Sequence, residues 1–491
     1  MTLQFGEEHL RCFSAASLDF NPSHLSESYA RRTSSGQRVV YGILGLLASL
    51  RYIRLPAQHI PSEVRIDFKG PLFLNVDYTI SVEQEDSSGA KVVLRDGSAS
   101  LLRARLRFQN GAAGAATLPE TGIAARQTSR TLDGSDLERL PAFQGTYSPG
   151  RASYQKLLEL LGADSGIWGD ALPLAALCSS YMTGMELPGE RAIYSGLRLK
   201  IPRQQIRTPF TFHIAVDSYD TQFGLTQAQF ALADATGTWA DGRISAIARP
   251  PRSASLAAPI EAGSGRFTGI VALIIGASRG LGAAMALELA AEGANVVGVY
   301  AQSQEDADAV LAASRHLPGC LAMERGDASD LNWCGALKSR VAARFGRLDL
   351  LVCNAAPALQ PLRIEEACYE RIQAYLVQGF ALVGAPLSSF LEPVSASRGS
   401  VLLISSSAVE EPPAVWPHYV ALKAAAEGLV RTAAVANPEI AFWIARPGRL
   451  LTDLTDTPMG RLDAETPQSV ARRILEQSSG RAAFSGVRFC R

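Results

Sequence analysis

The sequence predicts two architectures in one chain: an α+β region in which antiparallel sheets wrap helices, and then an α/β region with a doubly wound parallel sheet. Up to about residue 250, runs that alternate apolar and polar residues follow long apolar segments, and from residue 266 onward strand-like and helix-like runs alternate. A period of two indicates strands that are half buried on one face of a sheet. Alternating strands and helices imply a parallel sheet covered by helices on both faces.

The length and composition predict a multidomain globular protein. With 491 residues, 47% of them hydrophobic, the chain is too long for one compact core and apolar enough to fold throughout. Two stretches rich in small residues, 110–117 and 250–265, have the composition of linkers. We therefore expect three domains, at residues 1–113, 118–250 and 266–491.

The charge balance gives no reason to expect nucleic acid or an anionic membrane as a partner. Forty-seven basic residues balance forty-seven acidic ones, so a neutral small substrate or a protein-borne acyl chain fits better. The longest apolar run, Val39–Leu50, is too short to span a bilayer and is predicted to be a buried helix. Because no basic cluster precedes an apolar core at the N-terminus, we expect a cytoplasmic protein.

Neither the cysteines nor the histidines are spaced as metal ligands. The seven cysteines are scattered, odd in number and form no CxxC pair, so we expect reduced thiols and neither a disulfide framework nor a zinc site. Among the histidines outside the motifs below are His59, His213, His316 and His418. We interpret them as core or surface residues, of which only His418 is close enough to Tyr419 to touch a substrate, and we expect no metal.

The first two predicted domains share one pattern, which indicates an internal repeat. In each, an apolar helix is followed by alternating strands and a longer hairpin, with the helices expected near 41–53 and 173–186, the second opening with Pro173. The alternating apolar positions are Val64, Ile66, Phe68, Val76, Tyr78, Ile80 and Val82 in the first repeat, and Leu197, Leu199, Ile201, Phe210, Phe212, Ile214 and Val216 in the second. A helix wrapped by an antiparallel sheet is the hotdog arrangement, so the repeat predicts a double hotdog.

A glycine-rich turn opens the third predicted domain. Gly276, Gly280 and Gly282 stand in Gly-Ala-Ser-Arg-Gly-Leu-Gly, between the strand-like Val271–Ile275 and an alanine-rich helix. Small residues there let the backbone approach a pyrophosphate at a helix N-terminus, where amide donors and the dipole favour anions. Alone, the pattern also fits an ordinary glycine-rich turn.

A second set of residues favours the nucleotide-site interpretation. Tyr419 and Lys423 lie four residues apart on a predicted helix, hence on one face, and Ser406 follows the predicted strand 401–404. From Phe267 to the C-terminus the chain resembles the short-chain dehydrogenase/reductase family, whose fold is a Rossmann-type sheet. The other matching positions are Asp327, Asn354, Ala355, Ala356, Pro447, Gly448 and Thr452.

This resemblance implies a catalytic set and a cofactor. Tyr419 would donate a proton to a carbonyl, Lys423 would lower its pKa and hold the nicotinamide ribose, and Ser406 would bind the substrate oxygen. A phenol needs a neighbouring ammonium to exchange protons near neutrality. The implied cofactor-binding residues are Gly276, Ser278, Arg279, Gly280, Leu281, Gly282, Asp327, Asn354, Ala355, Ala356, Tyr419, Lys423, Pro447, Gly448 and Thr452.

The charges near the second predicted strand favour NADPH/NADP+ over NADH. The segment 299–303 reads Val-Tyr-Ala-Gln-Ser, without the carboxylate that would hold an adenosine 2′-hydroxyl. Arg279 in the glycine-rich turn can meet a 2′-phosphate.

One position departs from the family. Where its members place an active-site Asn on the helix before the catalytic strand, residues 373–378 read Gln-Ala-Tyr-Leu-Val-Gln. That Asn supports a water chain that leads to the lysine. Either Gln378 or a backbone group substitutes for it, or reduction is impaired.

A carboxylate and an imidazole flank an Asn-Pro turn near the N-terminus, in Asp19-Phe20-Asn21-Pro22-Ser23-His24. Two titratable groups in one pocket suit the addition or elimination of water beside a thioester. The alternative is an N-capping Asp and a surface His. However, the segment from Ser14 to Leu50 resembles MaoC-type (R)-specific enoyl-thioester hydratases and dehydratases.

By that resemblance Asp19 and His24 form the acid/base dyad, Asn21 orients it, and the amide near Gly42 polarises the thioester carbonyl. Tyr41 stands where His is common in that family. Counting back from the second predicted helix gives residues 151–153, Arg-Ala-Ser, which contain no such dyad. The second repeat is therefore expected to be structural.

Together the two resemblances predict a bifunctional 3-oxoacyl-thioester reductase and (R)-3-hydroxyacyl-thioester dehydratase of fatty-acid-like or polyketide-like synthesis. The expected substrate is an acyl thioester on an acyl carrier protein or CoA. The alternatives are a hydratase and 3-hydroxyacyl dehydrogenase that run in the β-oxidation direction, and a ketoreductase with a non-catalytic acyl-binding hotdog module. We expect a homodimer or homotetramer, because members of the reductase family commonly pack in this way.

Overall fold

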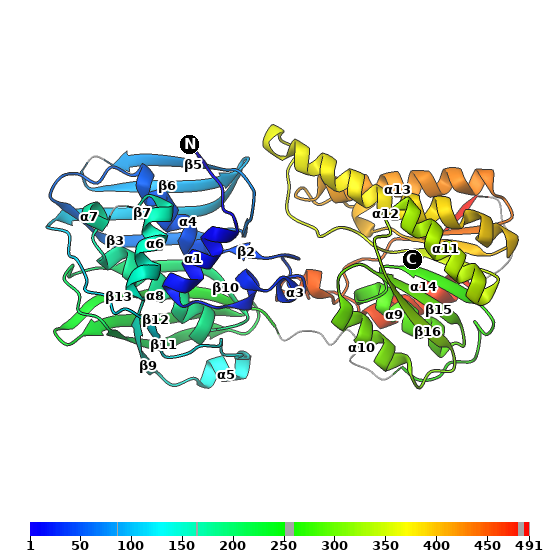
Figure 1. Ribbon diagram of the computed structural model, residues 1–491, viewed down its shortest axis with the longest axis horizontal. Coiled ribbons are helices and arrows are strands. Elements are labelled where there is room, and N and C mark those ends of the chain that lie inside the picture. Colours follow the sequence, from blue (N-terminus) through cyan, green and yellow to red (C-terminus); the bar gives the residue numbers. More distant parts are fainter. Residues whose placement is uncertain (86, 164, 251–259, 480–485, 491) are drawn as a thin grey trace. The chain divides into compact units, whose positions relative to one another are not determined.

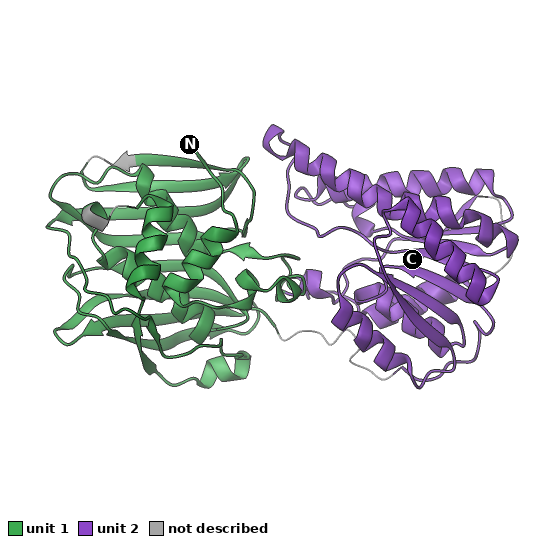
Figure 2. Cartoon of the chain, in the orientation of Figure 1, with its two compact units in different colours: residues 1–251, 457–459 green, residues 252–456, 460–491 purple. Residues whose placement is uncertain are grey.

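The computed structural model describes all residues except 86, 164, 251–259, 480–485 and 491 (Figure 1). The chain forms two compact units: unit 1 contains Met1–Pro251 and Thr457–Met459, and unit 2 contains Arg252–Asp456 and Gly460–Arg491 (Figure 2). Much of the predicted linker at 250–265 lies outside the described residues.

Unit 1 is built on one antiparallel sheet of eleven strands, in the order β1-β5-β6-β7-β3-β10-β13-β12-β11-β9-β8. The strands are β1 (Thr2–Leu3), β3 (His59–Phe68), β5 (Tyr78–Glu85), β6 (Gly89–Asp96), β7 (Ala99–Asn110), β8 (Ile123–Ala124), β9 (Phe143–Ser148), β10 (Ala192–Lys200), β11 (Phe210–Asp220), β12 (Leu225–Asp234) and β13 (Gly237–Ala248). A separate ladder joins β2 (Val39–Val40) to β4 (Leu72–Phe73).

Helices cover one face of this sheet. In Figure 1, α1 (Glu7–Ser17), α4 (Gly42–Ser49), α6 (Arg151–Leu161) and α8 (Ala171–Tyr181) lie in front of the strands. The remaining helices are α2 (Pro22–Leu25), α3 (Glu27–Ala30), η1 (Leu50–Tyr52), α5 (Gly134–Arg139), α7 (Ser165–Trp168) and η2 (Met182–Glu186). Every residue of α8 is buried, as is every residue of α4 after Gly42, because both helices pack against the apolar face of the sheet.

The internal repeat is visible in the order of the strands. Each half has a buried helix followed by a central strand, which is β3 in the first half and β10 in the second. The next three strands of each half approach this central strand in chain order from the outer side of the sheet: β5, β6 and β7 toward β3, and β11, β12 and β13 toward β10. We expected each half to have a sheet of its own, but β3 and β10 pair with each other, with Val64 opposite Leu199. The pairing satisfies two strand edges that separate sheets would expose.

The second helix also begins earlier than predicted. It starts at Ala171, so that Pro173 is its third residue and not its first. Proline fits there because the first amide groups of a helix have no intrahelical acceptor.

Unit 2 has the predicted Rossmann-type sheet. Its seven parallel strands run in the order β16-β15-β14-β17-β18-β19-β20, which reverses direction between β14 and β17. The strands are β14 (Val271–Ile275), β15 (Asn295–Tyr300), β16 (Cys320–Arg325), β17 (Leu350–Cys353), β18 (Ser400–Ile404), β19 (Ala441–Ala445) and β20 (Val487–Cys490). Ligands of such sheets bind at the carboxyl ends of the strands near the reversal point.

The helices of unit 2 are α9 (Gly280–Ala291), α10 (Gln304–Ser314), α11 (Leu331–Phe345), η3 (Glu366–Cys368), α12 (Tyr369–Ala396), η4 (Ser407–Val409), α13 (Pro417–Ala436), η5 (Asp453–Thr455) and α14 (Pro467–Ser478). Among the described residues, the segment Glu366–Ala396 alone is long and apolar enough to cross a membrane by length and composition. Its helix α12 packs against α11, α13 and β17, and its buried residues Val383, Leu387, Phe390 and Val394 belong to the core of unit 2.

Candidate functional site

The glycine-rich turn of unit 2 can be formed only by glycine at its key positions. Gly276 and Gly280 have φ values of +85° and +57°, in the left-handed region that favours glycine. A Cβ on Gly282 would lie 1.9 Å from the carbonyl oxygen of Gly276 and 2.6 Å from Nδ2 of Asn354. That Asn354 amide donates to the Gly276 oxygen over 2.8 Å, which ties the turn to the end of β17.

The turn leads into the N-terminus of α9 at the carboxyl edge of the sheet. The first amides of a helix lack intrahelical acceptors and favour an anion. Arg279 is the residue before α9, and its Nη1 lies 3.4 Å from Oδ2 of Asp453. A Cβ on Gly280 would lie 3.5 Å from the Thr452 methyl group, so the segment after β19 borders the same turn. The residues present therefore fit the pyrophosphate of a dinucleotide.

The other predicted cofactor residues lie at the ends of neighbouring strands. Asp327 follows β16, is exposed, and accepts a hydrogen bond from the Ser329 hydroxyl over 2.7 Å. Ala355 follows β17 and lies against Gly276. The Pro447 oxygen, after β19, accepts from the Ser407 amide over 3.1 Å. Ser278, Leu281, Ala356 and Gly448 lie in these same segments.

The structure brings the predicted catalytic residues together at the end of β18. Ser406 caps η4, and its Oγ accepts from the Ala408 amide over 3.2 Å. Lys423 on α13 donates from Nζ to the Ile404 oxygen over 2.8 Å, and Nζ lies 5.7 Å from the centre of the Tyr419 ring. Hence the hydroxyl, the phenol and the ammonium lie together at the carboxyl edge of the sheet.

Burial determines the protonation of this set. It raises the pKa of Tyr419, while a hydrogen bond with Ser406 acts in the opposite direction. Burial lowers the pKa of Lys423 to about 8. The sequence predicted that Lys423 would lower the pKa of Tyr419, but desolvation dominates here. Tyr419 is therefore protonated at neutral pH, in the form that can donate a proton.

The segment that lacks the family Asn lies in α12. Gln378 is exposed, whereas Tyr375 is buried in a cluster with Leu359 and Leu422 that also contacts Tyr419. The Tyr375 hydroxyl donates to the Pro357 oxygen over 3.3 Å, and its ring meets that of His418 at 4.4 Å. Of residues 373–378, Tyr375 is thus the one that lies buried beside the catalytic set.

In unit 1 the predicted dyad lies at the end of α1. Asp19 is only 2% exposed, and burial raises its pKa to about 7. Its Oδ2 accepts from the Ser180 hydroxyl over 2.8 Å, and its Oδ1 accepts from the Asn21 amide over 3.1 Å. Both hydrogen bonds oppose the effect of burial. The result is a carboxyl group that can hold or release a proton near neutral pH.

His24 is held in one tautomer. Its Nδ1 lies 2.7 Å from the Val39 oxygen, and because a carbonyl can only accept, Nδ1 carries the proton and Nε2 carries a lone pair. Burial is the largest cause that lowers the pKa of His24 to about 4, and the charge of Arg249 contributes. The imidazole is therefore neutral at physiological pH and can act as a base.

Tyr41 contacts both members of the dyad. Its hydroxyl donates to the backbone oxygen of Asp19 over 2.7 Å, and its ring stacks on that of His24 with centroids 3.7 Å apart. The next residue, Gly42, begins α4, where a Cβ would lie 2.6 Å from the Phe68 ring. The first amides of α4 thus follow directly on the residue that positions the dyad.

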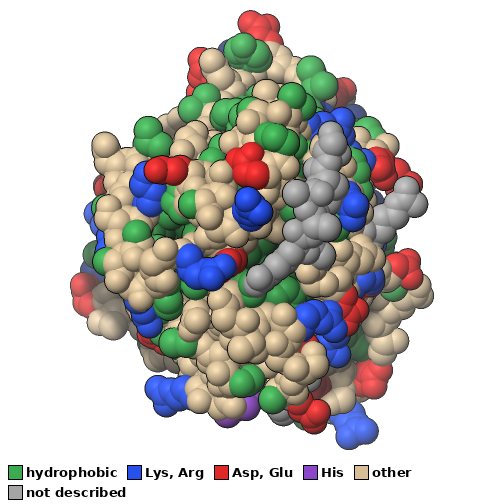
Figure 3. Space-filling model, turned by 90° about the vertical axis from the view of Figure 1, so that its right-hand side faces the viewer, with side chains coloured by type: hydrophobic (Ala, Val, Ile, Leu, Met, Phe, Trp, Pro, Cys, Tyr) green, Lys and Arg blue, Asp and Glu red, His purple; other side chains and the backbone are tan. Residues whose placement is uncertain are grey.

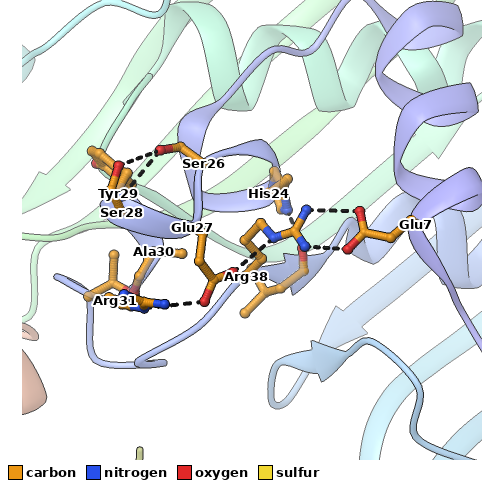
Figure 4. A network of polar contacts seen from close by, with 11 residues as sticks. Glu7, His24, Ser26, Glu27, Ser28, Tyr29, Ala30, Arg31 and Arg38 are labelled. Atoms are coloured by element: carbon orange, nitrogen blue, oxygen red, sulfur yellow. Dashed lines mark hydrogen bonds and ion pairs between the residues drawn. The ribbon is translucent and has the colours of Figure 1, made fainter. Parts of the chain in front are cut away.

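A charged network holds the segment that follows His24. Arg38 binds the carboxylates of Glu7 and Glu27, the latter over 3.1 Å, and Figure 4 shows it between them with His24 close by. The ion pair with Arg38 lowers the pKa of Glu7. The network ties α1 to the segment that leads into Val39, whose oxygen orients His24.

The second half of unit 1 contributes to the dyad site. The Asn21 side-chain amide donates to the oxygens of Gly184 and Gly189 over 3.1 and 3.0 Å. A Cβ on Gly184 would lie 2.3 Å from Oδ1 of Asp19. From the sequence we expected only a structural role for this half, and Ser180 could not be predicted because no local pattern links residues 161 positions apart.

The counterpart of the dyad in the second half differs from the expected one. Residues 151–153 lie in the first turn of α6. Leu18 and Gly162 end α1 and α6 with φ values of +56° and +62°, so Ala163 takes the place of Asp19. The connection to the buried helix is 9 residues long (162–170) where the first half has 24 (18–41), and it contains one short helix, α7, where the first half has α2 and α3.

Replacing Ser180 by Ala is expected to raise the pKa of Asp19 further, because its hydroxyl stabilises the carboxylate. A hydrogen bond of about 1 kcal/mol corresponds to a shift of roughly 0.7 units. For any activity that needs protonated Asp19, we measure kcat/KM as a function of pH. The pH at which kcat/KM falls on the alkaline side should be higher in the variant by the same amount. Ser179→Ala is the matched control, because its hydroxyl donates within α8 to Ala176. If this pH did not change, the assignment would be contradicted.

The fold and the site of unit 2 define an oxidoreductase that uses a nicotinamide dinucleotide. Residues 270–459 match the family described as short chain dehydrogenase. The chain belongs to the short-chain dehydrogenase family. This family binds NAD(P), and the cofactor supplies a hydride when bound.

Two relatives that are 33% identical to the chain support this assignment. Over 192 residues the chain is 33% identical to a 3-oxoacyl-(acyl-carrier-protein) reductase of Staphylococcus aureus strain Mu50, covering 38% of this chain and 76% of that protein. Over 236 residues it is 33% identical to cis-4-hydroxycyclohexanecarboxylate dehydrogenase of Sinomonas cyclohexanicum, covering 44% and 92%. A short chain dehydrogenase from Burkholderia cenocepacia J2315 in complex with NADP superposes with a TM-score of 0.42 and 27% identity, covering 46% of this chain and 97% of that one.

Proposed function

We propose that the protein is a bifunctional enzyme that reduces a 3-oxoacyl thioester and dehydrates the resulting (R)-3-hydroxyacyl thioester. The observation that carries the proposal is the pair of Asp19 and His24 in unit 1, a carboxyl that can hold or release a proton near neutral pH and an imidazole that is neutral there, in a chain whose unit 2 is an oxidoreductase. The relation to a 3-oxoacyl-(acyl-carrier-protein) reductase supports the choice of a thioester substrate.

In the reduction, the residues of unit 2 bind and protonate the ketone oxygen. The Ser406 hydroxyl and the Tyr419 phenol hydrogen-bond the oxygen, and Tyr419 gives it a proton as the cofactor delivers its hydride. Lys423, with a pKa of about 8 and its Nζ 5.7 Å from the centre of the Tyr419 ring, stabilises the tyrosinate that remains. Burial keeps Tyr419 protonated, which is the form that the reduction step requires.

In the dehydration, the residues of unit 1 remove one water. Nε2 of His24 takes a proton from C2, the C2–C3 double bond forms, and the hydroxyl on C3 leaves with a proton from the Asp19 carboxyl. The first amides of α4, beginning at Gly42, stabilise the negative charge that develops on the thioester oxygen. Asn21 holds the loop that carries both groups against the second half.

The same proposal includes the domain boundaries, the carrier of the substrate, the location and the oligomeric state expected from the sequence. Unit 1 would be a MaoC-like double hotdog, with domains at 1–113 and 118–250, a dyad in the first and none in the second. The reductase domain would span 266–491. The substrate would arrive on an acyl carrier protein, and the enzyme would work in the cytoplasm as a homodimer or homotetramer. A purely acyl-binding unit 1 is the second candidate, and a loss of dehydration on changing Asp19 would refute it.

We propose NADPH as the preferred cofactor, and replacing Arg279 by Gln tests this. Losing a charge-assisted contact with the 2′-phosphate of about 1.5–3 kcal/mol should raise the KM for NADPH about tenfold or more while the KM for NADH changes little. Steady-state kinetics with both cofactors measure the effect. Arg340→Gln, which breaks an ion pair with Glu324 on the surface of unit 2, is the control. An equal effect on both cofactors would contradict the assignment.

The overall proposal is tested by giving the purified enzyme a 3-oxoacyl thioester with NADPH and identifying the products by mass. Oxidation of NADPH together with loss of water supports both activities. If the hydroxyacyl thioester forms and no water is lost from it, unit 1 has only a binding role. No oxidation of NADPH, or of NADH in a parallel assay, would mean that neither Gln378 nor a backbone group replaces the missing Asn, and would leave a dehydratase with an inactive reductase.

A further inference from the structure

A buried glutamate, Glu427, lies one helical turn beyond Lys423 on α13. Its side chain is only 4% exposed. Residues four positions apart on a helix share one face, so the carboxylate lies on the same side of α13 as the ammonium of Lys423. Glu427 has no part in the reduction proposed for unit 2. Because a buried charge costs free energy unless other groups replace the lost water, its partners indicate what it does.

Arg446, directly before Pro447 at the end of β19, binds this carboxylate through two nitrogens. Its Nε donates to Oε1 of Glu427 over 2.8 Å, and its Nη2 donates to Oε2, which makes a bidentate pair. Arg431, one turn further along α13, approaches Oε2 at 3.3 Å. Burial acts to raise the pKa of Glu427, but hydrogen bonds and ion pairs outweigh it and the pKa is lowered. Glu427 is therefore an anion at neutral pH.

Ser405 connects Glu427 to the segment that carries the catalytic serine. The Ser405 hydroxyl donates to Oε1 of Glu427 over 2.6 Å, and its backbone amide donates to the Ala445 oxygen over 2.7 Å. The next residue is Ser406. One carboxylate on α13 thus links the ends of β18 and β19, directly beside Ser406 and one turn from Lys423.

Glu427 is the anion among the groups that surround Lys423. In the described part of the chain, titratable or charged groups reach these surroundings from α12, α13 and the ends of β17 and β19, namely Tyr375, Tyr419, Glu427, Cys353 and Arg446. Burial raises the pKa of Cys353 to about 12 and also raises those of both tyrosines, so these groups are neutral where Lys423 titrates. Burial lowers the pKa of Lys423 to about 8, and the charge of Glu427 opposes this fall.

Charges on the surface do not take over this role. The chain has a formal net charge of zero, and on the face of the molecule in Figure 3 basic and acidic side chains are interspersed. Salt screens exposed charges over about 10 Å at 0.1 M, whereas buried pairs are screened much less. The local carboxylate therefore acts on Lys423 more strongly than the surface does.

We propose that Glu427 is a positioning residue of the reductase that keeps Lys423 charged, and that Arg446 determines how much of the negative charge of Glu427 acts on Lys423. This inference rests on the proposed role of Lys423 in the reduction. Replacing a buried ion pair by apolar residues is often neutral or stabilising, so stability alone does not account for the pair. Its place one turn from Lys423 does.

Two substitutions should shift the pKa of Lys423 in opposite directions. Glu427→Gln removes the negative charge and leaves that of Arg446, so the pKa should fall by about 0.5 to 1 unit. Arg446→Gln removes the positive charge that neutralises Glu427, so the pKa should rise. NMR of protein with isotope-labelled lysine follows the titration directly, and the Lys423 signal is assigned by its loss in Lys423→Arg. A network that only supports the fold would not produce shifts of opposite sign.

The reduction should follow the same shifts, because the tyrosinate is stabilised only by a charged Lys423. The pH above which kcat/KM for reduction falls should be lower in Glu427→Gln and higher in Arg446→Gln. Glu288→Gln is the matched control, since Glu288 is also a buried helical glutamate of unit 2 and pairs with Arg472. It should change neither the pKa of Lys423 nor this pH.

An unchanged pKa of Lys423 in both variants, or shifts in the same direction, would overturn the inference. Thermal unfolding checks that each variant is folded. If Glu427→Gln does not fold, the direction of the shift in Arg446→Gln decides. If wild type reduces no 3-oxoacyl thioester, the proposed function fails, while the NMR titration needs no turnover and still tests the effect of Glu427 on Lys423.

Discussion

Replacing Tyr419 by Phe is expected to reduce kcat/KM for ketone reduction by about 10²- to 10⁴-fold, because the variant lacks the proton donor to the developing alkoxide. The change removes one oxygen atom from a residue packed against the Tyr375 and Leu422 cluster, so the fold should be retained. The rate is measured by loss of the nicotinamide absorbance with a 3-oxoacyl thioester. Binding of NADPH, followed by its fluorescence, should persist.

The control for this variant is Tyr369→Phe, the same chemical change at a residue of unit 2 that is 63% exposed. It should leave the reduction unchanged. A Tyr419 variant that retained more than about a tenth of the activity would show that another group donates the proton. Dehydration of a supplied 3-hydroxyacyl thioester should be equal in all three proteins, because the dyad lies in unit 1.

Replacing Asp19 by Asn is expected to lower dehydration by about 10²- to 10⁴-fold and to leave reduction unchanged, since the amide cannot supply a proton to the leaving hydroxyl. In wild type, kcat/KM for dehydration should be highest between the two pKa values. It should fall below pH of about 4, where His24 takes up a proton, and above pH of about 7, where Asp19 loses one. Product analysis with a 3-hydroxyacyl thioester across this range measures both limbs.

The same variant should be more stable than wild type in alkaline solution. Burial raises the pKa of Asp19 from 3.8 to about 7, so the folded state holds a proton that the unfolded chain has lost between these values. The stability contributed by the protonated carboxyl is complete below pH of about 4 and is lost as the pH rises to about 7, a difference of up to about 4 kcal/mol. Asn carries no such charge, so the variant should unfold at higher denaturant concentration at pH 8.

Asp170→Asn is the matched control for Asp19→Asn. Asp170 is also a buried carboxyl of unit 1, and it accepts from the Tyr154 hydroxyl and from the Ala116 amide over 2.8 and 2.7 Å. This substitution should keep dehydration. A normal rate in Asp19→Asn, or an equal loss in Asp170→Asn, would contradict the role of the dyad.

The parallel sheet and the residues at its carboxyl edge were predictable because each depends on short stretches of sequence. Strand 271–275 is continuously apolar, and the glycines that follow are required by the local φ values and by the approach of Gly282 to the Gly276 oxygen. Ser406 follows its strand directly, and Tyr419 and Lys423 share a helix face. Neighbouring parallel strands end at one edge, so local patterns are enough to predict that these residues meet.

Other features depend on contacts between distant segments. The pairing of β3 with β10, which joins the halves of unit 1, follows from unsatisfied strand edges that carry no local signature. The dyad loop was predicted in sequence, but its contacts with Ser180 and Gly184 were not. Likewise the shortened connection 162–170 became recognisable only when α1 and α6 could be compared.

By itself, the sequence determined the Rossmann-type sheet of unit 2, the positions of its glycine turn, and the chemical groups available for catalysis, because backbone conformation and periodicity are local properties. Only the tertiary structure decided how those groups are protonated. Asp19 holds its proton to a pH of about 7, and His24 remains neutral down to about 4, because packing removes water from both. Desolvation depends on everything that surrounds a group, and most of what surrounds these two residues comes from distant parts of the chain.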